Sequence, residues 1–222
     1  MTQKPEHDNE SSLKEALLEF KSLVDCFGIQ AMLAHGTLLW AYRNGFLGPW
    51  DADVDVILKI DNPDSIDFWD VLDEAEKRGF EYEFAMGDLD SIGLSNEEAK
   101  MKRLDWREWM SIIYLWWPSD KPCCYELEER GGRVRIDVVF AADTDKLRDR
   151  WKYYFENDTP TSSLYGAKFY IPSNVEKELV RHYGERWREY YCSSLVWGVH
   201  WKKLRDGIIP PEVKQWMDKH GL

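Results

Sequence analysis

Apolar and polar residues follow two different periods along this chain, and each period predicts a type of element. From Leu13 to Val24 apolar residues recur at helical spacing, which predicts a helix that Ser12 caps and Gly28 ends. Residues 53–60 instead alternate between acidic and apolar side chains and then continue as an apolar run, which predicts a strand.

The same criteria predict elements over the rest of the chain. Strands are expected at Ile29–Ala34, Glu81–Met86, Trp109–Trp117, Cys124–Glu129, Arg133–Phe140 and Phe169–Ile171. Helices are expected at Leu38–Asn44, Ile66–Arg78, 144–155, Asn174–Tyr183, 195–205 and 211–219, whereas Gly87–Arg107 has no clear period. This order predicts an α+β fold, a mixed β-sheet with helices on one side and a helical C-terminal part. We expect a flexible N-terminal tail over residues 1–12 and a single domain over 13–222.

Composition limits the function. Of the 222 residues, 44% are hydrophobic and 14% aromatic, which suffices for the core of one domain with elaborations. The 29 Lys and Arg face 41 Asp and Glu, and the net charge of −12 argues against bulk binding of nucleic acid or of anionic membranes. The chain has no apolar stretch long enough for a membrane span and no signal-peptide pattern, so we expect a cytoplasmic protein.

Three acids stand at a spacing of two where the strand 53–60 begins, namely Asp51, Asp53 and Asp55. On a strand such residues point to the same side about 7 Å apart, and like charges there repel. A divalent cation between them would relieve the repulsion, and ligand sets made only of oxygen favour Mg²⁺ or Mn²⁺. A solvated strand edge that is rich in acids is the alternative interpretation.

A further acid, Asp137, stands between Ile136 and Val138 in the expected strand Arg133–Phe140. An acid among apolar residues is costly to bury without a partner. If this strand lies beside residues 53–60, Asp137 joins the other acids. A half-exposed alternating strand would explain Asp137 taken alone, but its combination with the acidic triplet favours a metal site.

The stretch 35–56 resembles the LicD family of the nucleotidyltransferase superfamily, which includes the fukutin-related proteins. It contains the family's Gly-Thr-Leu-Leu, an Arg, Gly-Phe, Pro-Trp-Asp and the alternating Asp-hydrophobic-Asp. Ile171-Pro172-Ser173-Asn174 and a later Tyr-Gly-x-x-Trp at 183–187 are similar to its C-terminal motifs. Gly48 is an extra residue, and Ala52 stands where the family often has another acid.

The resemblance implies a nucleotidyltransferase-like mixed sheet flanked by helices and a metal-dependent transferase. Such enzymes move a phosphorylated group, phosphocholine or a phospho-alditol, from a cytidine-diphosphate donor to a sugar hydroxyl. The partners would be a nucleotide-diphosphate donor and a glycan or small-molecule acceptor. By position, Asp53, Asp55 and Asp137 match the family's catalytic metal ligands, and Asp51 matches a supporting one.

Other residues are candidates for binding the substrate. Gly36 and Thr37 open a short helix, where backbone N–H groups can hold a donor phosphate. Arg43 is a candidate phosphate ligand, although a surface ion pair is equally compatible with its position. A basic run that would usually be a solvated face is a further candidate for the substrate entrance: Lys100, Lys102, Arg103 and Arg107.

Two other functions remain open from the sequence. The same acids would serve a nucleotidyltransferase that uses a nucleoside triphosphate on a small molecule, RNA or protein. The leaving group separates the two reactions, since a diphosphate donor releases a nucleoside monophosphate and a triphosphate releases pyrophosphate. A non-catalytic scaffold is the third possibility, and the retained set of carboxylates argues against it.

Overall fold

A computed structural model describes residues 10–48, 53–118, 133–155, 158–185 and 187–188. The chain divides into two compact units, Met1–Val175 and Glu176–Leu222. Helix α9 (Val175–Tyr183) belongs almost entirely to the second unit. Most of that unit lies outside the described residues, so the predicted extent of a single domain stays a prediction.

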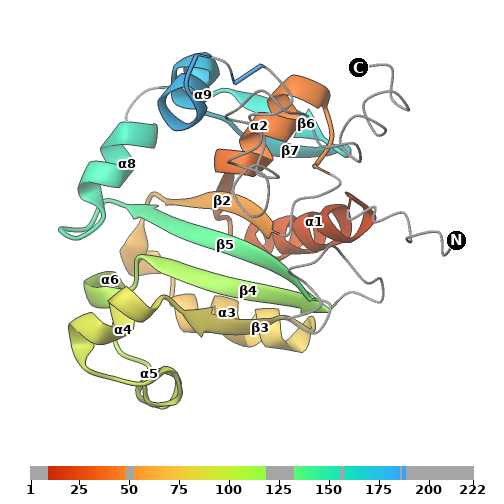
Figure 1. The fold of residues 1–222 in the computed structure, drawn as a ribbon. Helices are drawn as coiled ribbons and strands as arrows, with labels where there is room; N and C mark the ends of the chain where they lie inside the picture. Colours follow the sequence, from red (N-terminus) through yellow and green to blue (C-terminus); the bar gives the residue numbers. More distant parts are fainter. Residues whose placement is uncertain (1–9, 49–52, 119–132, 156–157, 186, 189–222) are drawn as a thin grey trace, which may run out of the picture. The chain divides into compact units, whose positions relative to one another are not determined.

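The described residues of the first unit form a mixed sheet of seven strands in the order β3-β4-β5-β2-β1-β7-β6 (Figure 1). The strands are β1 (Gln30–Leu33), β2 (Asp53–Ile60), β3 (Glu81–Phe84), β4 (Ile112–Pro118), β5 (Arg133–Ala142), β6 (Thr161–Leu164) and β7 (Ala167–Tyr170). Strand β2 runs parallel to β5 and β1 parallel to β7, whereas the other neighbouring pairs are antiparallel. The predicted α+β fold with a mixed sheet is confirmed.

Helices lie between the strands and against the sheet. They are α1 (Glu10–Cys26), α2 (His35–Asn44), α3 (Phe68–Lys77), α4 (Met86–Ile92), α5 (Asn96–Lys102), α6 (Trp106–Trp109) and α8 (Arg148–Phe155), with a short 3₁₀ turn at Pro63–Ser65. Helices α1 and α3 contact each other and the sheet, α2 contacts β2, and α8 contacts β5 (Figure 1). Within the described ranges, no helix is long and apolar enough to cross a membrane.

The alternation along β2 and β5 gives the sheet two different faces. One face is fully buried and carries Val54 and Val56 of β2 together with Ile136 and Val138 of β5. The residues between them are half-buried and include the acids. Near the C-terminal ends of the two strands this second face is covered by Phe155 of α8, which joins a small apolar cluster. On this face the acids thus lie in the N-terminal halves of β2 and β5.

Several predicted boundaries differ from the structure. The prediction that Ser12 caps the first helix is wrong: α1 begins at Glu10, within the expected tail, and Ser12 is buried inside it. A hydrogen bond of 2.7 Å from the Tyr165 hydroxyl to Glu10 ties this additional turn to the rest of the unit. Helix α2 begins at His35, earlier than expected, so Gly36 lies inside its first turn.

The region without a clear period forms the short helices α4, α5 and α6, and α6 includes Trp109, so β4 begins only at Ile112. The short polar strand β6 was not expected from the sequence. The expected strand Cys124–Glu129 and the expected helices at 195–205 and 211–219 lie outside the described residues.

Candidate active site

Parallel pairing of β2 with β5 brings together acids that are 82 residues apart in the chain. The register places Asp55 beside Asp137 and Asp53 beside Arg135. Neighbouring strands lie about 4.8 Å apart, and residues in register on them share one face. All four side chains therefore gather on the half-buried face in the N-terminal halves of both strands, and the strand pairing on which the placement of Asp137 depended is present.

Helix α2 holds Asp55 through two hydrogen bonds. The Gly36 N–H donates to Oδ2 of Asp55 at 3.1 Å, and the Asp55 N–H donates to the Thr37 hydroxyl at 2.8 Å. Thr37 is buried. His35, directly before them, has φ of +39°, a conformation that residues other than glycine rarely adopt. Gly36 and Thr37 thus position Asp55, and their predicted contact with a donor phosphate stays a prediction.

The carboxyl of Asp55 is in an unfavourable place for a negative charge. Burial raises its pKa, and the neighbouring Asp53 and Asp137 raise it further. The Gly36 N–H and Arg135 lower it, but the pKa still lies well above the ordinary value. The surroundings therefore disfavour the charged form of Asp55, and an additional cation beside it would favour that form.

Arg135 is a site residue that the sequence analysis missed. Its Nη2 lies 2.7 Å from Oδ2 of Asp53 and 2.9 Å from Oδ2 of Asp137, and its Nε donates to the other oxygen of Asp137. Burial alone would lower the pKa of its guanidinium, but the two acids raise it above the ordinary value. The sequence does contain a signal for it, because a residue two positions before Asp137 on an alternating strand lies on the same face.

Strand β4 adds an aromatic side chain next to the acids. Tyr114 is in register with Asp137 on one side and with Glu83 of β3 on the other. The Arg135 guanidinium lies over the Tyr114 ring, 5.2 Å from its centroid, in a cation–π contact. One row across the sheet thus reads Glu83, Tyr114, Asp137 and Asp55.

The donor set fits a hard divalent cation in chemistry, since it offers carboxylate oxygens from two adjacent strands. In the described part of the chain, however, no three Asp, Glu, His or Cys side chains converge as a metal site. Oxygens of Asp53 and Asp137 face Arg135 instead. Asp51, the fourth predicted ligand, lies outside the described residues.

Arg43 lies in the last turn of α2. Its guanidinium is 4.9 Å from the centre of the Trp40 ring, and its Nε donates to Asn44 at 2.8 Å. These contacts fix the side chain against its own helix, and its predicted role in phosphate binding stays a prediction.

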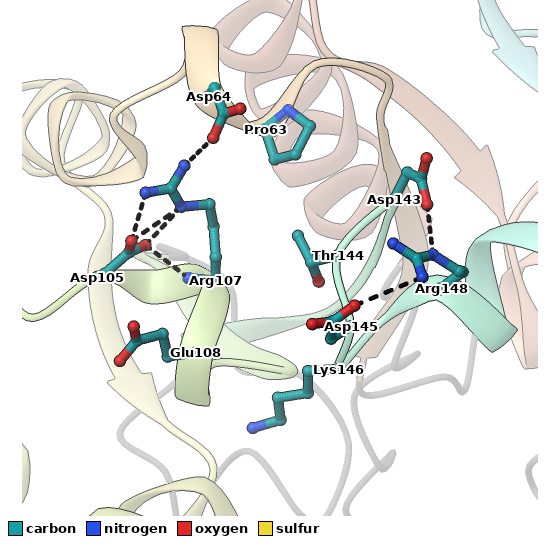
Figure 2. Close-up of a pocket in the computed structure, with 10 residues that line it drawn as sticks. All are labelled: Pro63, Asp64, Asp105, Arg107, Glu108, Asp143, Thr144, Asp145, Lys146 and Arg148. Atoms are coloured by element: carbon teal, nitrogen blue, oxygen red, sulfur yellow. Dashed lines mark hydrogen bonds and ion pairs between the residues drawn. The ribbon is translucent and has the colours of Figure 1, made fainter.

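A charged depression of about 550 Å³ lies elsewhere, where the chain leaves β2 and β5 (Figure 2). It contains none of the predicted acids or phosphate ligands, and only Arg107 of the basic run lines it. Arg107 forms ion pairs with Asp64 and Asp105, and Arg148 with Asp143 and Asp145. Both arginines are thus held by acids of the same surface, and we do not assign this depression to the active site.

Comparison with known proteins supports the resemblance seen in the sequence. A family model described as LicD/FKTN/FKRP, nucleotidyltransferase domain, matches residues 28–179. The matched part contains α2, β2 and β5 and therefore all the described acids of the site. No curated protein matches the chain.

Proposed function

The chain belongs to the LicD/FKTN/FKRP nucleotidyltransferase family, and we propose that it transfers phosphocholine or a phospho-alditol from a cytidine-diphosphate donor to a sugar hydroxyl. The observation that carries the proposal is the register of β2 and β5. It places Asp53, Asp55 and Asp137 side by side on one half-buried face. Family membership supports a transferase, and the donor and acceptor classes are the proposal.

Asp53, Asp55 and Asp137 would hold Mg²⁺ or Mn²⁺, with Asp51 as a further ligand. When bound, such ions stabilise the negative charge that develops on the transferred phosphoryl oxygens. The chain itself fixes one of the carboxylates in advance, since Gly36 and Thr37 hold Asp55 from α2. A preorganised ligand costs no rearrangement when the ion arrives.

The transfer itself needs one proton acceptor. The acceptor hydroxyl loses its proton to Asp137, and its oxygen forms a bond to the phosphorus that carries the head group. The phosphorus–oxygen bond to cytidine monophosphate breaks, and cytidine monophosphate leaves with the electron pair. No oxidant or further reactant is required. Asp137 suits this role because its side chain is partly exposed, at 21%, and lies beside the proposed metal ligand Asp55.

The test is product analysis with purified protein, Mg²⁺ or Mn²⁺, and a panel of cytidine-diphosphate conjugates with sugar acceptors. We expect release of cytidine monophosphate and transfer of the head group. Asp137→Asn is expected to lower the rate at least about 100-fold, as for loss of a general base. Glu83→Gln is the matched control, because Glu83 lies in the same row of the sheet, two strands from Asp137.

The products decide between the candidate functions. Release of pyrophosphate from nucleoside triphosphates, with no reaction of the diphosphate donors, would replace the proposal by nucleotidyl transfer. Full activity of Asp137→Asn would contradict the role of Asp137 as base. Absence of reaction and of nucleotide binding would favour a non-catalytic scaffold.

A further inference from the structure

Arg135 occupies oxygens that the proposed metal ligands would need. Both oxygens of Asp137 accept hydrogen bonds from its guanidinium, and Oδ2 of Asp53 lies 2.7 Å from its Nη2. The bond geometry is forked, which is the strongest arrangement between an arginine and carboxylates. The guanidinium therefore stands between two acids that come from different strands.

A divalent cation and the guanidinium compete for these oxygens. A ligand oxygen lies about 2.1 Å from Mg²⁺, so an ion bound by Asp53 and Asp137 would lie within a few ångströms of the Arg135 charge. Like charges at that distance repel strongly in a partly buried site. The same oxygen lone pairs also cannot serve both partners. Metal binding through the lone pairs that Arg135 occupies therefore requires that Arg135 moves away.

Charge at the site favours this exchange. Three carboxylates face a single guanidinium in the cluster of Asp53, Asp55, Asp137 and Arg135. The side chain of Arg135 is 21% exposed, so it has access to solvent when it leaves. The Tyr114 ring beneath its guanidinium offers a second contact that does not depend on the acids.

We propose that Arg135 is an exchangeable counter-ion of the metal site. It holds Asp53 and Asp137 in place before metal binds and leaves their oxygens when a divalent cation arrives, so it sets the metal concentration at which the site forms. This inference rests on the proposed function, because it takes these acids as metal ligands.

The test is a calorimetric titration of the full chain with Mn²⁺ alone, which measures the affinity for the ion. We expect Arg135→Gln to bind Mn²⁺ about ten-fold more tightly than the wild-type protein, which corresponds to about 1.4 kcal/mol. Arg133→Gln is the matched control. Arg133 stands two positions earlier on β5, is 43% exposed and pairs with Glu81, so its loss changes the net charge equally without freeing the site. We expect a change of less than about two-fold, because solvent and salt screen an exposed charge.

Thermal stability gives a second readout. Without metal, Arg135→Gln is expected to melt at a lower temperature than the wild type, since the acids lose their counter-ion. Saturating Mn²⁺ should then raise its melting temperature by more than that of the wild type. Arg135→Lys keeps the charge but loses the fork, so a smaller gain in Mn²⁺ affinity is expected. It supplies the test if the glutamine variant does not fold.

Equal or weaker Mn²⁺ binding after substitution of Arg135 would overturn the inference, and so would equal gains in the Arg133 and Arg135 variants. Failure of every protein to bind Mn²⁺ would overturn it together with the metal dependence of the proposed function. The Mn²⁺ titration contains no nucleotide donor, so its result is independent of the product analysis. Tighter Mn²⁺ binding by the Arg135 variant, together with no release of cytidine monophosphate in the product analysis, would support the exchange and contradict the proposed function.

Discussion

Asp55 shows at the scale of one residue how the chain prepares the site. Its backbone N–H and its carboxylate both bond to the first turn of α2, at Thr37 and Gly36. The first N–H groups of a helix have no intrahelical partners, and these bonds join that turn of α2 to the beginning of β2, which carries the acids. The hydroxyl of Thr37 is thus a structural acceptor, and a change at this residue affects both stability and the position of Asp55.

We predict that Thr37→Val destabilises the protein by about 1–3 kcal/mol, because the partly buried Asp55 N–H loses its acceptor. Urea unfolding measures the free energy directly. Thr37→Ser is the control, since it keeps the hydroxyl and loses only a methyl group, which should cost about 1 kcal/mol. A valine variant as stable as the serine variant would contradict the structural role of this hydrogen bond.

The raised pKa of Asp55 predicts a dependence of stability on pH. Burial first, and then Asp53 and Asp137, make its folded-state pKa higher than the unfolded value of 3.8. The folded state thus holds the proton more tightly, and the stability associated with this group is lost as pH rises from about 4 through the folded-state pKa. In a chelating buffer, Asp55→Asn should therefore be more stable than the wild type at pH 7, by a margin that shrinks toward pH 4.

Urea unfolding at a series of pH values measures this margin. Asparagine still accepts from the Gly36 N–H, so the comparison isolates the charge. Asp61→Asn is the control, because Asp61 is exposed beyond the end of β2 and pairs with Lys59 at 3.0 Å. The prediction would be contradicted if the difference in free energy of unfolding between Asp55→Asn and the wild type were constant over this pH range. It would also be contradicted if the wild type were the more stable protein at pH 7, because the folded state would then not raise the pKa of Asp55.

At the scale of elements, the sequence predicts what depends on local pattern. Strand β2 has the predicted limits, since its alternating acids and its apolar run both end within it. Strand β6 was not predicted because it is only four residues long and three of them are polar, so it shows no apolar alternation. The first residue of α2 was not predicted correctly, because His35 begins the helix with a positive φ that no local sequence pattern encodes.

The candidate site follows the same division. The three acids are visible in the sequence because alternation places them on one side of their strands. The pairing of β2 with β5 is a tertiary fact, and it is this pairing that brings Arg135 to Asp53. A search for metal ligands in the sequence considers acidic residues and not arginines. The contact of Arg135 with these acids can therefore be recognised only when the strand register is known.

The turn between β6 and β7 connects distant elements and yields a prediction at this scale. The Tyr165 hydroxyl accepts from the Leu47 N–H at 2.7 Å and donates to Glu10 at 2.7 Å. Tyr165 has φ of +52°, which a bulky residue adopts only at a cost. Tyr165→Phe should therefore destabilise the protein by about 1–3 kcal/mol, because Leu47 and Glu10 lose their partner.

Urea unfolding again provides the measurement, and Tyr153→Phe is the control because the Tyr153 side chain is half exposed on α8. A stability equal to that of the wild type would show that the turn holds its conformation without the hydroxyl.

The charge of the whole molecule bears on how the substrate binds. With a net charge of −12, the protein does not attract a nucleotide diphosphate through its overall field. Among the described site residues Arg135 is already engaged by Asp53 and Asp137. We therefore expect favourable binding of an anionic donor to depend on a divalent cation at the acids.

This dependence predicts the response of the folded molecule to its ligands. A ligand that binds only the native state stabilises it by about 2.7 kcal/mol at one hundred times its Kd. For a chain of 222 residues this amounts to about 5–10 °C in melting temperature. We expect such a shift with a cytidine-diphosphate conjugate and Mn²⁺ together, and a much smaller one with the conjugate alone.

Asp55→Asn should lose the shift, whereas Asp61→Asn should keep it, since the two variants remove the same charge from opposite ends of β2. A shift of equal size without Mn²⁺ would contradict the argument from charge, because positively charged side chains of the protein would then suffice to bind the donor. Loss of the shift in both variants would contradict a specific role of Asp55, because a less negative net charge by itself favours binding of an anionic donor.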